Sequence, residues 1–520
     1  MSCIEEEFMY KEIEKLIELI DNASVYEVAT KSSLEPALKL SRRLGNKILF
    51  KREDTQQVFS FKLRGAYNKI RKLSDAERIQ GVITASAGNH AQGVALAAQK
   101  LKISAVIVMP KTTPDIKVKS VRDLGGEVIL HGNAYDDAYS KAREIAEQQN
   151  RVFVHPYDDL DVIAGQGTIA KELLEQCENM DIVFIPVGGG GLVAGLSAYL
   201  KTKKPNIKII AVEPEDAACF DAAMKSGERT VLEQVGIFAD GVAVRQIGEE
   251  PFNIAKHYVD EVLTVNTDEL CAAIKDIFDD TRTIAEPAGA LAIAGIKKYL
   301  DENKTKSKNL VAIVSGANIN FDRLRHVAER AEIGEQREAI LAVSIPEKPG
   351  SFRAFCKIIG QHGITEFNYR FASTEKAHIF VGVKLERGEE DKIKLIKLLK
   401  SKNYPVIDMT DNEMAKIHVR YMVGGHNQVN PQDKTPAKEC LYRFQFPERP
   451  GALLRFLDHM GEDWNISLFH YRNHGAAYGR ILVGIQLPDE QQTQFTDFLD
   501  EIKYPYWDES DNPAYELFLS

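Results

Sequence analysis

Residues 182–201 read IVFIPV-GGGG-LVAGLSAYLK, and they place four consecutive glycines, Gly188 to Gly191, between a strand-like run and a helix-like run. Glycine lacks a Cβ, so these residues can adopt backbone conformations closed to other residues and let a ligand approach closely. The free N–H groups at the start of the following helix then form a binding site for an anion. The stretch therefore predicts a protein that holds a phosphorylated small molecule.

Short apolar runs alternate with helical patterns from about residue 40 to 330. The expected strands are 47–50, 82–85, 105–109, 127–130, 152–154, 182–187, 207–212 and 310–314, with helices between them such as 90–101 and 163–175. Such alternation predicts an α/β fold with a mostly parallel sheet covered by helices. Ligands bind at the carboxyl ends of such strands, so the loops 86–89, 188–191 and 315–318 are expected at one rim.

Past residue 330 the sequence contains an internal repeat. IPEKPG at 345–350 recurs as FPERPG at 446–451, ITEFNYR at 364–370 recurs as ISLFHYR at 466–472, and IFVGVKL at 379–385 recurs as ILVGIQL at 481–487. Each copy predicts a strand, a Pro-Gly turn, a helix, two strands and a second helix. Two such α+β units can pair their sheets, each covering an edge left open in the other.

Composition limits the classes of partner. The net charge of −10 argues against nucleic-acid binding, and no apolar run is long enough to span a membrane. The acidic N-terminus does not resemble a secretory signal, and its apolar residues at helical spacing predict a docking helix instead. The six cysteines form no CxxC pair, which indicates reduced thiols in a cytoplasmic protein. The docking residues are Ile13, Leu16, Ile17 and Ile20.

Lys62 is the candidate reactive residue. On a helix, Phe59 and Ala66 would share its face at i−3 and i+4. A lysine among apolar neighbours has a lowered pKa, and its neutral amine is a nucleophile that forms a Schiff base with an aldehyde. A phosphate site combined with such a lysine points to pyridoxal phosphate. The alternative is an ordinary solvated surface charge.

Other interpretations stay open from the residues alone. Gly189, Gly191 and Ala194 also satisfy G-x-G-x-x-A, which would make the protein a nicotinamide-dependent oxidoreductase. The stretch 86–90 is either a local polar turn or an anion site, and Ser315 either caps a turn or meets a ring nitrogen. A non-catalytic amino-acid sensor would keep the C-terminal repeat without needing Lys62.

Five ordered motifs carry a family resemblance. They are SFKLRGA at 60–66, SAGNHAQG at 86–93, PVGGGGLVAG at 186–195, EPAGALA at 286–292 and SGAN at 315–318. Over about residues 20–325 the chain resembles the threonine/serine dehydratases among the fold-type-II pyridoxal-phosphate enzymes. The C-terminal repeat resembles the pair of ACT-like regulatory domains of biosynthetic threonine deaminases.

The resemblance implies a division of the chain and a role for each motif. It implies a catalytic domain over 1–330, a linker over 331–338, ACT-like domains over 339–411 and 439–511, and a connection over 412–438. Lys62 would carry pyridoxal phosphate and remove the substrate's α-proton. The cofactor would also contact Asn89, Ser315 and the loop of Gly188, Gly189, Gly190, Gly191 and Leu192. The substrate carboxylate would meet Ser86, Ala87, Gly88, Asn89 and His90.

The implied reaction is dehydration and deamination of L-threonine, and of L-serine, to the keto acid and ammonia; threonine gives 2-oxobutanoate. This is the first step of isoleucine biosynthesis. Isoleucine would inhibit the enzyme and valine would oppose that inhibition, with Tyr369 and Tyr471 as candidate effector residues. The family also implies a homotetramer.

Two stretches depart from the family pattern. The usual Thr-Pro-Leu reads Ser32-Ser33-Leu34. The divalent-metal site of some relatives uses a glutamate and an aspartate, and the matching residues here are Glu213 and Cys219. Because cysteine replaces the aspartate, no required divalent metal is expected. Glu286, in the fourth motif, either positions the cofactor or substrate or complements a helix dipole.

Overall fold

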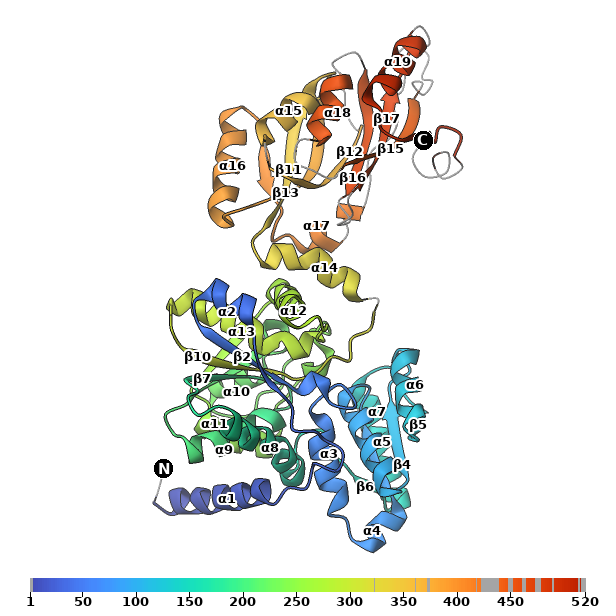
Figure 1. Ribbon diagram of the computed structural model, residues 1–520. Helices are drawn as coiled ribbons and strands as arrows, with labels where there is room; N and C mark the ends of the chain where they lie inside the picture. Colours follow the sequence, from blue (N-terminus) through green and yellow to red (C-terminus); the bar gives the residue numbers. More distant parts are fainter. Residues whose placement is uncertain are drawn as a thin grey trace. The chain divides into compact units, whose positions relative to one another are not determined.

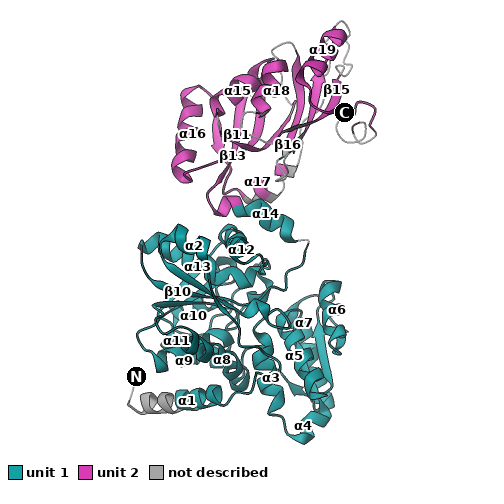
Figure 2. Cartoon of the chain, viewed as in Figure 1, with its two compact units in different colours: residues 1–331 teal, residues 332–520 magenta. Residues whose placement is uncertain are grey.

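The computed structural model describes residues 3–321, 323–360, 362–371, 375–417, 419–421, 439–447, 452–460, 464–472, 478–488, 491–512 and 515. The chain forms two compact units, Met1–Ala331 and Glu332–Ser520 (Figures 1 and 2). None of the helices in the described ranges has the length and apolarity needed to cross a bilayer.

Unit 1 is built on two mostly parallel sheets, which confirms the fold class implied by the family resemblance. The larger sheet has the order β1-β2-β10-β7-β8-β9. Its strands are β1 (Leu34–Pro36), β2 (Lys47–Arg52), β7 (Ile182–Pro186), β8 (Lys208–Pro214), β9 (Glu261–Val265) and β10 (Asn309–Val314). All neighbours pair in parallel except β1, which lies antiparallel to β2.

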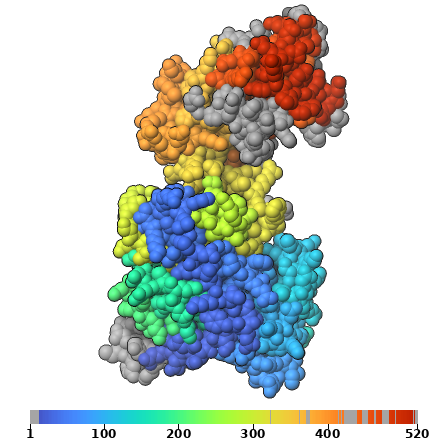
Figure 3. Space-filling view, viewed as in Figure 1, coloured from blue at the N-terminus to red at the C-terminus, as the bar shows by residue number. Residues whose placement is uncertain are grey.

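The smaller sheet has the order β5-β4-β3-β6 and is entirely parallel. Its strands are β3 (Val82–Ala85), β4 (Ala105–Met109), β5 (Glu127–Leu130) and β6 (Val152–Phe153). The expected strands therefore exist, but the chain divides them between two sheets. In the space-filling view, the cyan atoms of the β4–β5 region form one flank of unit 1 (Figure 3).

Helices cover both faces of both sheets. They are α1 (Cys3–Asp21), α2 (Leu38–Leu44), α3 (Lys62–Arg71), α4 (Asp75–Gln80), α5 (Asn89–Leu101), α6 (Asp115–Asp123), α7 (Tyr135–Gln149), α8 (Leu160–Gln176), α9 (Gly191–Lys203), α10 (Cys219–Ser226), α11 (Glu249–Tyr258), α12 (Thr267–Thr281), α13 (Pro287–Asn303) and α14 (Arg323–Gly334). Short 3₁₀ turns are η1 (Glu53–Thr55), η2 (Glu215–Ala217) and η3 (Asp240–Val242).

Successive side chains of a strand point to opposite faces of the sheet, and both faces of the buried strands pack against an apolar core. Nearly every residue of these strands is therefore apolar. In β7, Val183 packs in the core with α8 and α9, whereas Phe184 packs in the core with α12 and α13. The docking helix is confirmed: α1 packs against α8 and α9, and its four predicted apolar residues are at most 8% exposed.

Unit 2 contains one eight-stranded sheet, of order β14-β11-β13-β12-β16-β17-β15-β18, with every neighbour antiparallel. The first repeat supplies β11 (Glu338–Pro346), β12 (Ile364–Arg370), β13 (Lys376–Lys384) and β14 (Val406–Asp408). The second supplies β15 (Glu439–Pro447), β16 (Asn465–Arg472), β17 (Tyr478–Gln486) and β18 (Tyr506–Asp508). The predicted pairing of the two repeats occurs between β12 and β16.

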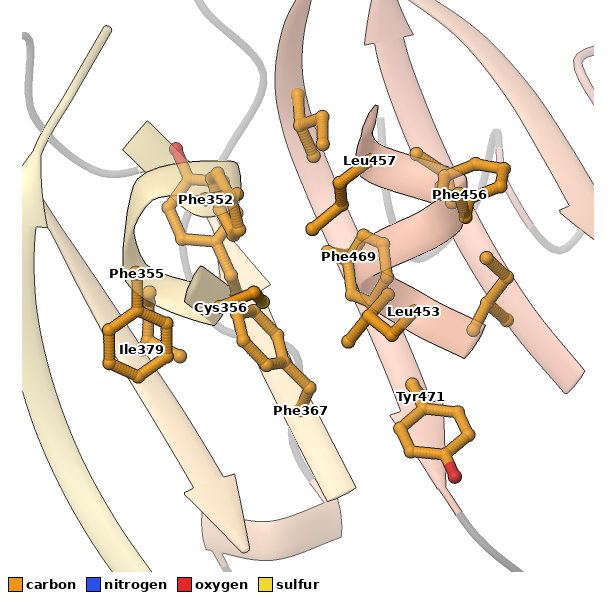
Figure 4. Packing of buried hydrophobic residues seen from close by; sticks show 14 of the residues in the cluster. Phe352, Phe355, Cys356, Phe367, Ile379, Leu453, Phe456, Leu457, Phe469 and Tyr471 are labelled. Carbon is orange, nitrogen blue, oxygen red and sulfur yellow. The ribbon is translucent and has the colours of Figure 1, made fainter. Parts of the chain in front are cut away.

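The helices of unit 2 are α15 (Ser351–Ile359), α16 (Glu389–Ser401), α17 (Glu413–Ile417), α18 (Ala452–Met460) and α19 (Gln492–Ile502), with the 3₁₀ turn η4 (Val419–Tyr421). Phe352 and Phe355 of α15 and Phe456 of α18 belong to one apolar cluster that runs across both repeats (Figure 4). The two repeats therefore share a single core.

The connections differ in part from the expected linkers. Helix α14 continues to Gly334 and β11 begins at Glu338, so most of the stretch 331–338 is regular structure. The connection 412–438 includes α17 and η4, and its residues 418 and 422–438 lie outside the described residues. Residues 448–451 of the second Pro-Gly turn also lie outside them.

Candidate active site

A pocket in unit 1 brings together the three loops that were expected at one rim. This prediction is confirmed although the loops follow strands of two different sheets, since Asn89 follows β3 whereas the glycine run and Ser315 follow β7 and β10. The lining residues are Phe61, Lys62, Asn89, Tyr157, Pro186, Gly188, Gly189, Gly190, Gly191, Leu192, Gly241, Val242, Glu286, Ala288 and Ser315.

Lys62 is the first residue of α3 and its side chain reaches into this pocket. The amine donates a hydrogen bond to the carbonyl of Pro156 at 3.1 Å. Burial lowers the pKa of Lys62 to about 8, although the negative charge of Glu286 opposes that shift. About a tenth of this amine is therefore neutral at about pH 7, far more than for an ordinary lysine, and the neutral form is the one that a nucleophile or base requires.

The helical-face argument for Lys62 was wrong in one respect. Helix α3 begins at Lys62, so Phe59 precedes the helix; it is 56% exposed and has a positive φ of 53°. Its carbonyl accepts from Ala317 N–H at 2.9 Å, and Phe61 N–H donates to the carbonyl of Ser315 at 3.2 Å. The desolvation of Lys62 comes from the pocket walls, and backbone hydrogen bonds hold its segment against the Ser315 loop.

The glycine run forms another part of the pocket lining. Gly190 is the N-cap of α9, has a φ of 92° and provides no side-chain cap. Positive φ strains other residues, so glycine is required there. A Cβ on Gly189 would lie 2.1 Å from the ring of Tyr157, and one on Gly188 would lie 2.8 Å from Val242. The run therefore leaves room at a helix N-terminus only because it lacks side chains.

Asn89 lies at the centre of a short hydrogen-bond chain. Its amide donates to the Glu286 carboxylate at 2.6 Å, and its carbonyl oxygen accepts from the Asn318 amide at 2.6 Å. Burial raises the pKa of Glu286 to about 7. Glu286 precedes α13 as its N-cap residue but makes no side-chain cap there, so its structural role is the contact with Asn89.

Of the stretch 86–90, Asn89 lines the pocket, whereas Ser86, Ala87, Gly88 and His90 are not among the lining residues. The N-cap of α5 is Gly88, and the Ser86 hydroxyl accepts from Gly88 and Ala91 N–H at 3.3 Å. A Cβ on Gly88 would meet no atom within 4 Å. The His90 ring is buried and contacts the carbonyl of Val154 at 3.0 Å, and burial lowers the pKa of His90 to about 3.

Ser315 is buried at the end of β10, and its hydroxyl donates to the carbonyl of Ala288 at 3.2 Å. A hydroxyl carries no charge at neutral pH, so it can meet a ring nitrogen without providing a counter-ion.

The Glu213 carboxylate and the Cys219 thiol both form hydrogen bonds within the protein. The Glu213 carboxylate accepts from Phe220 and Asp221 N–H at 2.9 and 2.8 Å at the start of α10, and burial raises the pKa of Glu213 to about 8. The Cys219 thiol donates to the carbonyl of Gly188 at 3.5 Å. Among the described residues no group of His, Cys, Asp and Glu side chains is arranged to hold a metal ion.

Sequence reasoning missed several pocket residues. Tyr157, Gly241 and Val242 lie outside the five motifs and meet the glycine run only in the folded chain. Tyr157 follows the short strand β6 and a proline, a weak signal at the carboxyl end of a strand. Gly241 and Val242 lie in η3, and no local pattern distinguishes them from an ordinary turn.

Taken together, the fold and the pocket define a class of enzyme. The pocket lining combines a lysine with a lowered pKa, the glycine N–H groups at a helix N-terminus, the amide of Asn89 and the hydroxyl of Ser315. This donor set fits pyridoxal phosphate, since an aldehyde needs the amine, a phosphate needs the N–H groups, and a pyridine ring needs the polar side chains. The class is that of the pyridoxal-phosphate enzymes with mostly parallel sheets.

Comparison with known proteins agrees. The family described as "Pyridoxal-phosphate dependent enzyme" matches residues 26–316, and the "C-terminal regulatory domain of Threonine dehydratase" matches residues 329–419 and 433–519. The chain belongs to the pyridoxal-phosphate-dependent enzymes and, within them, to the family of the biosynthetic threonine dehydratases. The nicotinamide interpretation of the glycine run is wrong.

The relatives match over nearly the whole chain. The biosynthetic L-threonine dehydratase IlvA of Burkholderia multivorans is 53% identical over 96% of this chain and 98% of its own length. The Escherichia coli enzyme of that name is 53% identical over 96% of each chain. The processed form of threonine deaminase isoform 2 from Solanum lycopersicum is similar in structure, with a TM-score of 0.61 and 50% identity over 62% of this chain and 94% of that one.

Proposed function

We propose that the protein converts L-threonine to 2-oxobutanoate and ammonia as the first step of isoleucine biosynthesis, and that it also accepts L-serine. The observation that carries the proposal is the pocket whose lining includes both Lys62 and the glycine run. Its support is the 53% identity, over 96% of the chain, to dehydratases named for that reaction.

Pyridoxal phosphate, when bound, supplies an aldehyde that condenses with amines and a ring that withdraws electrons. Gly188–Gly191 and Leu192 would hold its phosphate through backbone N–H groups at the start of α9. Asn89 and Ser315 would orient its ring. An uncharged hydroxyl at Ser315 leaves the ring a weaker electron acceptor, which suits loss of a β-hydroxyl more than storage of a carbanion.

Lys62 acts as the base. The neutral amine accepts the α-proton of the substrate, and its pKa of about 8 allows both forms near neutral pH. The backbone N–H groups of 86–90 would bind the substrate carboxylate at the N-terminus of α5, where Gly88 leaves open space. The elimination releases the β-hydroxyl as water, and hydrolysis of the enamine product yields the keto acid and ammonia.

A keto-acid assay with threonine and with serine tests the reaction. We expect turnover of both substrates by the wild type and none by Lys62→Ala. Borohydride reduction of the cofactor-loaded protein should add a pyridoxyl group at Lys62, detected by mass spectrometry. Retained turnover in Lys62→Ala, or label at another lysine, would refute the assignment.

For regulation, we propose that unit 2 binds isoleucine as an inhibitor and valine as its opponent. The Tyr369 hydroxyl donates to Glu347, and the Asn465 amide from the second repeat donates to the same carboxylate at 3.4 Å. A half-buried carboxylate at the junction of the repeats can bind the ammonium group of an amino acid. Tyr471 occupies the equivalent place on β16, and both tyrosines are 2% exposed.

Two matched variants test this assignment. Tyr369→Phe removes the hydroxyl that contacts Glu347, so we expect the isoleucine concentration for half-inhibition to rise at least fivefold with unchanged kcat. Tyr471→Phe is the matched variant in the other repeat, and it shows whether valine acts there. Unchanged responses of both variants to both amino acids would reject the tyrosines as effector residues.

We further propose a homotetramer in the cytoplasm. The free thiols of Cys177, Cys219 and Cys356 are compatible with a reducing compartment. Light scattering of the purified full chain should give four times the 58.2 kDa of one subunit. A monomer mass at micromolar concentration would contradict the assembly.

A further inference from the structure

Two residues after Lys62, an arginine is completely buried. Arg64 has 0% exposure, and all five of its N–H groups have acceptors. The guanidinium donates twice to Glu53, both at 2.8 Å, and once to Glu172 at 2.6 Å. The remaining donors reach the hydroxyl of Thr168 at 3.0 Å and the carbonyl of Thr30 at 3.2 Å. A buried guanidinium is stable only when it is paired in this way.

The two carboxylates are themselves buried and paired further. Glu172 also accepts from the amine of Lys51 at 2.6 Å, and Glu53 also accepts from the hydroxyl of Ser32 at 2.6 Å. Lys51, Glu53, Arg64 and Glu172 are each 0% exposed. Two positive and two negative charges therefore balance inside the protein, and the removal of one would leave a buried charge without a partner.

Each partner of Arg64 belongs to an element that supports a different wall of the pocket. Glu53 follows β2, which pairs in parallel with β10, the strand that ends at Ser315. Glu172 lies on α8, which packs against α9, the helix that begins at the glycine run. Arg64 itself lies on α3, which packs against α5, the helix that begins at Asn89.

The helices around this network are in close backbone contact. A Cβ on Gly65 would lie 2.6 Å from the carbonyl of Val162, and one on Gly165 would lie 2.6 Å from the Cα of Gly65. A Cβ on Gly195 would lie 2.6 Å from the carbonyl of Ile163. The backbones of α3, α8 and α9 therefore touch, and any shift of α3 changes where Lys62 points.

Apart from the backbone hydrogen bonds that join Phe59 and Phe61 to the Ser315 loop, few contacts fix Lys62. Its amine has a hydrogen bond to Pro156, and the first turn of α3 has no side-chain cap. We propose that Arg64 is a positioning residue for Lys62, acting through Glu53 and Glu172 to fix the first turn of α3 against the Ser315 and glycine walls. This inference rests on Lys62 being the point of attachment proposed above.

The test uses the full-length protein titrated with pyridoxal phosphate. We expect Arg64→Met to weaken cofactor binding at least tenfold. Per bound cofactor, its visible circular dichroism band should fall by at least half, because that band reports how Lys62 holds the chromophore. Arg64→Lys keeps the positive charge but loses the bidentate hydrogen bond with Glu53. We therefore expect its cofactor affinity and its dichroism band to lie between those of the wild type and Arg64→Met.

Arg43→Met is the control. It removes an arginine that pairs with Asp276 at 2.7 Å between α2 and α12, away from α3. We expect it to lower thermal stability but to leave the dichroism band and cofactor affinity unchanged.

Wild-type affinity and dichroism in Arg64→Met, with only a lower melting temperature, would overturn the inference. Should Arg64→Met fail to fold, Arg64→Lys decides: at least threefold weaker binding with a reduced band supports the role, and wild-type values reject it. Absence of a pyridoxyl group at Lys62 in the reduced wild-type protein would instead refute the proposed function.

Discussion

A single methyl group on the glycine run should weaken cofactor binding, and Gly189→Ala is the sharpest such change. The added Cβ would lie 2.1 to 2.4 Å from three ring carbons of Tyr157. Non-bonded carbons prefer separations of about 3.5–4.0 Å. The ring or the loop must therefore move by more than ~1 Å.

Contacts with His155 restrict movement of the Tyr157 ring. Its ring packs edge-on against His155 with the ring centres 4.7 Å apart, and its N–H donates to the same imidazole at 3.3 Å. Overpacking of this kind costs about 1–3 kcal/mol. If the loop absorbs that strain, the affinity for pyridoxal phosphate falls about 5- to 150-fold.

Equilibrium titration of the cofactor-free protein with pyridoxal phosphate measures this loss. Tyr157→Ala combined with Gly189→Ala makes room for the methyl group and should recover at least half of the lost binding free energy in a double-mutant cycle. Unchanged affinity in Gly189→Ala, or no recovery in the double variant, would refute the steric argument.

Three further predictions follow from the site. With a pKa of about 8, the neutral fraction of Lys62 should make its capture of pyridoxal phosphate, trapped with borohydride, rise roughly 90-fold from about pH 6 to about pH 9 and then level off; a rise that continues past about pH 10 would show an ordinary lysine. Gly88→Ala meets no atom within 4 Å, so its stability should change by less than ~0.5 kcal/mol while KM for threonine rises; unchanged KM would move the carboxylate site elsewhere. Because N–H groups already satisfy Glu213, EDTA treatment should leave turnover unchanged, and a loss restored by Mg²⁺ would contradict this expectation.

Most strands of unit 1 were predictable because parallel strands that are buried on both faces consist of short apolar runs in the sequence. The expected runs 82–85 and 105–109, buried at every residue, match β3 and β4 residue for residue, and the run 127–130 matches the partly exposed edge strand β5. The division into two sheets was not predictable, since pairing depends on contacts between distant strands such as β2 and β10. The edge strands β1 and β9 were both missed, because β1 has too few side chains to show a period and β9 is only partly buried.

The site was predictable only where glycine or lysine has an unusual setting. The glycine run and Lys62 were found because each makes little sense on an exposed surface. Arg64, Glu53 and Glu172 were not found, because charged residues normally lie in solvent and nothing local marks these three as buried. Asn89 and Glu286 meet across 197 positions of sequence, which no local pattern can encode.

The pairing of the two repeats in unit 2 determines which strands lie at the edges of their shared sheet. Because β12 and β16 pair with each other, the edge strands of this sheet are β14 and β18. Each is three residues long and ends in an aspartate. Short strands with acidic ends are poor templates for another chain. Subunits of this protein should therefore associate through helices and sheet faces, and strand-to-strand growth into open-ended fibres is disfavoured.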